Sequence, residues 1–138
     1  MQVLRYAFNA ASAVSVACLL SSGPVFASGQ ILCDATDASG ASIEIAVGHL
    51  PVLAVLGATA TDGVETWSTN ATGDQKPMVF GQGFSGDNRI VADFTDPNVE
   101  RIVVSLRLFE ASGTGGYAEA GVLSFEGISA FPVQCDNG

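Results

Sequence analysis

The sequence predicts an all-β fold, a single antiparallel β-sandwich or barrel of about eight or nine short strands with the first and last strands joined by a disulfide. Three observations support this. Apolar residues recur at every second position over much of residues 28–138. The chain has 16 glycines and is rich in Thr, Val and Ser. Turn-forming pairs follow one another at short intervals, as in sandwiches and barrels.

Residues 1–27 have the features of a cleaved signal peptide. Arg5 provides a positive start, an apolar stretch follows over residues 10–20, and Val25-Phe26-Ala27 is typical of a cleavage site before residue 28. The apolar run is shorter than the roughly 20 residues that a membrane-spanning helix needs. We therefore expect no membrane span and export to the periplasm or the extracellular space.

The alternative for this leader is a lipoprotein signal. Ser15-Val16-Ala17-Cys18 resembles a lipobox, in which Cys18 would be lipidated instead of removed. Ser15 stands where such a motif carries an aliphatic residue, so cleavage is the favoured interpretation. Residues 28–138 then form a single β-domain, which by its length can build a core of its own.

The first two strands are expected to form a hairpin. The first covers residues 30–36, and the turn chemistry of residues 37–40 reverses the chain. Residues 41–48 return with Ile43, Ile45 and Val47 on one face.

The next pair is expected at residues 50–61 and 64–70. The first of these is more apolar than its neighbours, so we expect it to be largely buried. Pro51 should stand at its start, because proline cannot donate a hydrogen bond within a ladder. Gly57 indicates a bulge, and Asp62-Gly63 is a strong two-residue turn signal.

Five strands complete the predicted fold, at residues 78–84, 88–95, 101–111, 117–126 and 128–136. Alternation is clearest in the third of them, where Ser105 and Arg107 face outward. In the fourth, the apolar residues change parity between Val122 and Leu123, which predicts a bulge near Gly121.

The charge of the domain is strongly negative. Without the leader, four basic residues (Lys76, Arg89, Arg101 and Arg107) stand against fourteen acidic ones, a net charge of −10. The domain lacks the basic footprint of a nucleic-acid surface, and an anionic membrane would repel it. The acidity favours solubility and, for any partner, a cationic protein.

Cysteine and histidine contents limit the chemistry. Cys33 and Cys135 remain after cleavage, and two cysteines in an exported chain most simply form one disulfide. His49 is the only histidine, so no metal-ligand cluster or cofactor motif is indicated. The glycine pattern of residues 81–86 matches GxGxxG, but a strand pattern follows it instead of the helix that a dinucleotide site requires.

Four residues are candidates for contact with a partner. Trp67 shares strand parity with polar residues and could anchor a partner, although a place in the core is the competing interpretation. Asp93, Asp96 and Glu100 lie around one turn and could meet a cationic surface or bind Ca²⁺.

No motif in the sequence specifies a function. The favoured hypothesis is an exported, non-enzymatic β-domain that binds a protein or small ligand in the cell envelope, for example a cationic hydrolase. The alternatives are a small hydrolase that uses carboxylates and a purely structural envelope protein.

Overall fold

The structure, a computed structural model, describes residues 29–137, and the predicted signal peptide and cleavage site lie outside them. The described chain consists of ten strands: β1 (Gly29–Ala35), β2 (Ser42–Val47), β3 (Val55–Thr61), β4 (Thr66–Ser68), β5 (Lys76–Pro77), β6 (Val79–Gly86), β7 (Arg89–Thr95), β8 (Ile102–Gly113), β9 (Gly116–Phe125) and β10 (Ser129–Asn137). Within this range, no helix has the length and hydropathy that a membrane crossing requires.

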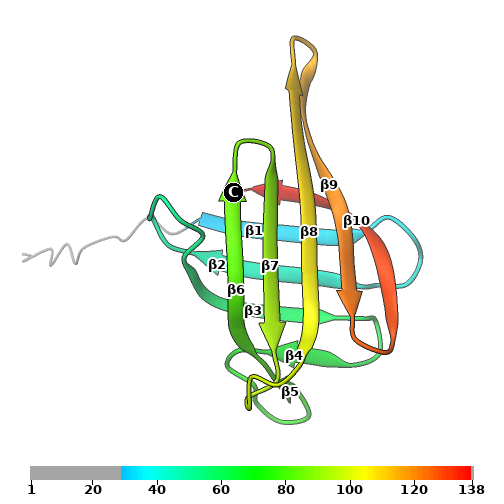
Figure 1. Cartoon of the computed structure of the whole chain (residues 1–138). Helices are drawn as coiled ribbons and strands as arrows, with labels where there is room; N and C mark the ends of the chain where they lie inside the picture. Colours follow the sequence, from blue (N-terminus) through cyan, green and yellow to red (C-terminus); the bar gives the residue numbers. More distant parts are fainter. Residues whose placement is uncertain (1–28, 138) are drawn as a thin grey trace, which may run out of the picture.

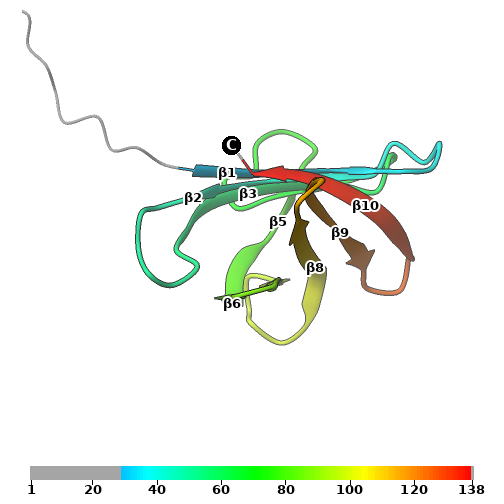
Figure 2. The same cartoon turned by 90° about the horizontal axis from the view of Figure 1, so that it is seen from above.

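All ten strands belong to one sheet, in the order β5-β4-β3-β2-β1-β10-β9-β8-β7-β6. Figure 1 shows that the sheet folds over on itself, so that β1–β3 cross behind β6–β9. β10 pairs with β1 on one side and β9 on the other, and it curves between the two layers in Figure 2. The result is a nearly closed, barrel-like sheet, as the sequence predicted.

The core lies between the two layers. The alternating residues Ile43 and Ile45 of β2 face Val104, Leu106 and Leu108 of β8 across it, and all five are almost completely buried. Other large side chains of the core come from β1, β4, β6, β7, β9 and β10 and the residue before β6: Ile31, Trp67, Met78, Phe80, Ile90, Phe94, Leu123, Phe125, Phe131 and Val133. Period-two patterning therefore positions the strands of both layers.

The disulfide between Cys33 and Cys135 is confirmed. The two residues are register partners in β1 and β10, with Cα atoms 4.0 Å apart and a sequence separation of 102. The bridge joins the first strand to the last at the place where the two layers of the sheet meet.

The segment before β3 differs from the prediction. Residues 48–54 form a loop, closed at its neck by the hydrogen bond from Gly48 N to Ala54 O, and the strand begins only at Val55. Pro51 therefore lies in a loop and not at the start of a strand. The predicted bulge is present at Leu56, since Ala46 pairs with Gly57 and Val47 with Val55. One pairing, between β4 and β5, is parallel and not antiparallel.

The predicted bulge near Gly121 is wrong. β8 and β9 pair in continuous register from Val104 opposite Phe125 to Gly113 opposite Gly116. Leu123 and Phe125 face the core, so the three apolar residues of opposite parity, Ala118, Ala120 and Val122, are exposed on the other side. Bulges occur instead at Gly81 in β6 and at Val103 in β8, which lies opposite Phe94 and Thr95 of β7.

Candidate functional site

The strands β6–β9 present one face to the core and one to solvent. We call the solvent side the outer face. The cross-strand register places the following residues on it: Gln82, Phe84, Arg89, Val91, Asp93, Ser105, Arg107, Phe109, Ala111, Ala118, Ala120, Val122 and Ser124. One half of the outer face is polar and the other half is apolar, with Arg107 between them.

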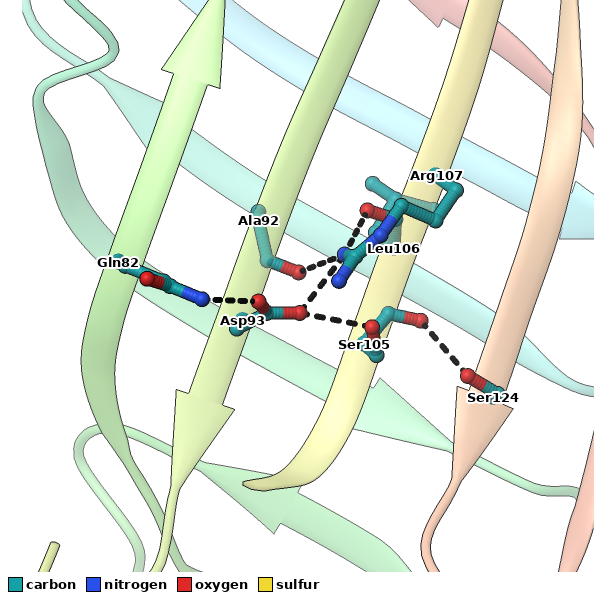
Figure 3. A network of polar contacts seen from close by, with 7 residues as sticks. All are labelled: Gln82, Ala92, Asp93, Ser105, Leu106, Arg107 and Ser124. Carbon is teal, nitrogen blue, oxygen red and sulfur yellow. Dashed lines mark hydrogen bonds and ion pairs between the residues drawn. The ribbon is translucent and has the colours of Figure 1, made fainter. Parts of the chain in front are cut away.

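The polar half is organised by Asp93, whose side chain is only 1% exposed. Its Oδ1 accepts a hydrogen bond from Ser105 Oγ at 2.7 Å and lies 2.7 Å from Arg107 Nη1. Its Oδ2 accepts a hydrogen bond from Gln82 Nε2 at 2.8 Å. Figure 3 shows these side chains converging on Asp93 from both neighbouring strands. The carboxylate therefore has partners for both oxygens, as a buried charge requires.

The pKa of Asp93 reflects two opposed effects. Burial disfavours the charged form and by itself raises the pKa of this carboxyl. The hydrogen bonds from Arg107, Gln82 and Ser105, together with the charge of Arg107, outweigh burial and hold its pKa below the ordinary value for Asp. Asp93 is therefore ionised at neutral pH and acts as a fixed negative anchor for Arg107.

Arg107 is held flat against the sheet but remains accessible. Its Nη1 also donates to the carbonyl oxygens of Leu106 at 2.9 Å and Ala92 at 3.5 Å. The side chain is 41% exposed, and Nε and Nη2 make no hydrogen bond within residues 29–137. Nε and Nη2 can therefore donate two hydrogen bonds to a planar anionic group of a binding partner. This is the geometry in which arginine binds a carboxylate.

The apolar half of the outer face lies on the other side of this arginine. Phe109 is 64% exposed, Phe84 49% and Val122 43%. The Cζ atom of Arg89 lies 5.2 Å from the centroid of the Phe84 ring, a cation–π distance. The alanines of β8 and β9 keep the surface around Phe109 flat. Two of the four basic residues of the domain thus lie among exposed apolar side chains.

The outer side of the other layer, formed by β1, β2 and β10, is acidic. Asp34 of β1, Glu44 of β2 and Asp136 of β10 are exposed, and the register places them on the outer side of that layer around Leu32. The domain therefore has one acidic side and one side with arginines and apolar groups, a distribution that net charge does not reveal.

Trp67, a predicted contact residue, lies in the core. It is 5% exposed, and its ring centroid is 4.8 Å from that of Phe125. Lys76 Nζ lies 5.1 Å from the centroid of the indole ring. The competing interpretation of Trp67 as a core residue is therefore the one observed.

The three acidic candidates are not brought together. Asp93 is turned toward Arg107, whereas Asp96 Oδ1 accepts hydrogen bonds from the backbone N–H groups of Glu100 at 2.8 Å and Arg101 at 3.2 Å. The backbone hydrogen bond from Glu100 is the main reason that the pKa of Asp96 is lowered. Glu100 itself is exposed. In the part of the chain that the structure describes, no three potential ligand side chains gather around a point that could hold a metal ion.

Sequence reasoning placed Arg107 outward but missed Phe84 and Phe109 as surface residues. The signal for Phe109 was available, because it has the same parity as Ser105 and Arg107 in the most regular strand. An aromatic residue on the outward parity of a clear strand indicates a candidate contact residue.

A scan against protein-family models and searches of curated proteins and of solved structures find no match to this chain. The function of the outer face is therefore inferred from the chemistry of its own residues.

Replacing Arg107 with Met is expected to lower the free energy of unfolding by about 2–3 kcal/mol at pH 7. The change leaves Asp93 buried without its charge partner, and the cost stays below the roughly 3–5 kcal/mol of a fully buried pair because Arg107 is 41% exposed. Asp93→Asn should cost only about 1 kcal/mol, since it leaves a cation that solvent can reach. Urea unfolding of both variants measures the difference.

The cost of Arg107→Met should also depend on pH. A depressed pKa of Asp93 stabilises the fold above the unfolded value of about 3.9, and this stabilisation is lost as the pH falls through the lower folded value. Without the hydrogen bond and the charge of Arg107, the pKa of Asp93 rises relative to wild type, so protonation relieves part of the penalty at low pH. The gap between wild type and variant should therefore be smaller at pH 3.5 than at pH 7, and an unchanged gap would contradict the role assigned to the pair.

Proposed function

We propose that this domain is an exported, non-enzymatic binding module that holds another protein through the outer face of β6–β9. The observation that carries the proposal is the exposed apolar half of that face, with the pre-positioned Arg107 at its edge. The disulfide supports export, because such bonds persist in oxidising compartments such as the periplasm and the extracellular space.

The composition of the outer face suits a protein partner. Exposed apolar patches on soluble domains mark interaction sites, and aromatic residues and arginine are the side chains that most often dominate binding energy. Phe109 projects from a surface of alanines, so a flat partner surface can exclude water around it. Asp93 already orders Arg107, which reduces the entropy that would be lost on binding.

The partner is expected to present an apolar patch bordered by a carboxylate. A carboxylate opposite Arg107 would use the donors at Nε and Nη2. Two of the candidate contact residues, Asp93 and Asp96, lie close to this face but should not repel a carboxylate of the partner. Asp93 is buried and neutralised by Arg107, and Asp96 accepts hydrogen bonds from backbone N–H groups. The same engagement leaves neither acid placed for acid–base catalysis.

A cationic protein, such as a cationic hydrolase, is a second candidate partner. It would bind the opposite, acidic side, where Asp34, Glu44 and Asp136 are exposed. Such an association would be steered by charge, so its rate would fall steeply with salt. Binding through the outer face would show a weaker salt dependence, since most of its contact is apolar.

The proposal is tested with a photoreactive amino acid at Ala118, an exposed position on the outer face. Illumination of cells that export the protein should give a discrete cross-linked adduct. Phe109→Ala should reduce its yield about tenfold or more, as expected for a contact above roughly 1.4 kcal/mol. Arg107→Gln should also reduce it.

Two control variants test whether the loss of cross-linking is specific to the outer face. Val64 is 89% exposed on the far layer, and Arg101 has a side chain that is 65% exposed. Val64→Ala and Arg101→Gln should leave the adduct unchanged. An adduct that survives Phe109→Ala, or that Val64→Ala weakens equally, would overturn the proposal.

A further inference from the structure

A cavity of about 300 Å³ lies at one open end of the barrel-like sheet, away from the outer face. It is bounded by the loop 48–54, the start of β1 and the adjacent parts of β6, β7 and β8. The residues that line it are Gly29, Gln30, Ile31, Val47, Gly48, Leu50, Pro51, Val52, Leu53, Ala54, Ser85, Ile90 and Glu110. Its volume is at the lower end of the range of about 300–1,000 Å³ that ligand sites have, and the mouth of a barrel is a common place for one.

Eight of the 13 lining residues have apolar side chains. Ile31 and Ile90 are 4% and 6% exposed and belong to the core, so they form the inner wall. The loop supplies the outer wall, where Leu50 and Val52 are 64% and 66% exposed. The hydrogen bond of 2.8 Å from Gly48 N to Ala54 O holds the neck of this loop. Exposed apolar side chains beside a cavity would be partly covered by an apolar ligand.

Glu110 is the only charged side chain among the described residues of the lining. It continues the inward-facing row of Leu106 and Leu108 along β8, and it is half-buried. Its carboxylate makes no hydrogen bond or ion pair within residues 29–137. The register partner of Glu110 on β9 is a second carboxylate, Glu119, which is 2% exposed and accepts a hydrogen bond from Tyr117 Oη at 2.6 Å.

We propose that this cavity binds a small organic cation, an amine with an apolar body. The ammonium group would lie against the Glu110 carboxylate as a charge-assisted hydrogen bond, and the apolar body would lie between Ile31, Ile90 and the loop 48–54. The negative charge of Glu110 favours a cation and disfavours a carboxylate or phosphate ligand. The volume restricts the ligand to a small one. This site is independent of the protein contact on the outer face.

The test compares 2-phenylethylamine with 2-phenylethanol, which has the same apolar body and no charge. Each is titrated into the purified exported protein, and the amide signals are followed by NMR. The amine should shift the signals of residues 29–31, 48–54 and 110, and it should bind at least about tenfold more tightly than the alcohol. Equal affinities, or shifts confined to other residues, would overturn the proposal.

Two variants sharpen the result. Glu110→Gln keeps the shape of the side chain and should remove the preference for the amine, whereas Glu100→Gln, an exposed acid in the loop between β7 and β8, should keep it. Ala54→Phe should fill the cavity and weaken both compounds. A preference for the amine that survives Glu110→Gln would show that another group holds the ammonium and would contradict the assignment.

Discussion

Replacing both Cys33 and Cys135 with alanine is expected to lower the free energy of unfolding by about 4–5 kcal/mol. The disulfide closes a loop with a sequence separation of 102 residues, and the chain-entropy model gives this magnitude for a loop of about 100 residues. The cost is large because β1 and β10 come from opposite ends of the domain, so the bond restricts nearly the whole unfolded chain. Urea unfolding of the oxidised protein and of the double variant measures the loss.

Reduction of the wild-type protein supplies the control for this experiment. Cys33 is 1% exposed, so its replacement also removes packing contacts of the sulfur atom. A reductant breaks the bond and leaves both sulfur atoms in place. The reduced protein should lose nearly as much stability as the double variant. A loss below about 1 kcal/mol on reduction would show that the native pairing of β1 with β10 does not need the bridge.

Gly121→Ala is expected to be the most disruptive single substitution in the β8–β9 hairpin, with a loss of at least about 3 kcal/mol. An added Cβ would overlap the carbonyl oxygen of Arg107 and would lie 2.8 Å from its carbonyl carbon and 2.9 Å from Leu108 Cα. All three atoms belong to the backbone of the neighbouring strand, so no side-chain rotation can relieve the overlap. The strands would have to separate, which weakens the ladder that holds the outer face. Thermal and urea unfolding report the loss.

Gly115→Ala is the matched control for that change. Gly115 lies in the loop between β8 and β9, and an added Cβ there would meet nothing within 4 Å. This variant should stay within about 0.5 kcal/mol of wild type. If the two alanine variants unfold at similar denaturant concentrations, then the close approach at Gly121 is relieved by small backbone shifts and the expectation is wrong.

Separation of β8 and β9 at Gly121 should also affect the proposed contact with a partner. Arg107, whose carbonyl oxygen approaches Gly121, also provides the cation of the proposed contact surface. Gly121→Ala should therefore weaken the proposed partner contact in the molecules that remain folded. The proposed amine site should be less affected, because β1, β6, β7 and the loop 48–54 form most of it.

Much of the fold was predictable from local pattern. In β2 and β8 one parity is aliphatic and the other polar, so the alternation identified both the strands and the faces that became buried. The pairing of Cys33 with Cys135 followed from the count of cysteines once the leader was set aside. Composition also predicts that the domain has no basic nucleic-acid surface, because it has only four basic residues, and this stays a prediction.

The candidate site was predicted less well, because both parities of β9 carry apolar residues. Alternation then cannot say which parity is buried, and the choice depends on the neighbouring strand. Leu123 and Phe125 face the core because their register partners, Leu106 and Val104, do. Val122 is left exposed beside Arg107, and the bulge that the sequence suggested is not needed.

Sequence by itself determined the elements whose information is local: strands with one apolar parity, turns that contain Asp and Gly, the disulfide and the net charge. The tertiary structure decided the features that depend on distant neighbours. Asp93 is buried only because Gln82, Ser105 and Arg107 come from adjacent strands to satisfy it. The apolar segment 48–54 forms a loop whose side chains line a cavity at the open end of the sheet, and this cavity exists only after the strands have assembled. Burial is a property of the assembled layers, and a pattern along one strand specifies it only when the two sides of that strand differ in polarity.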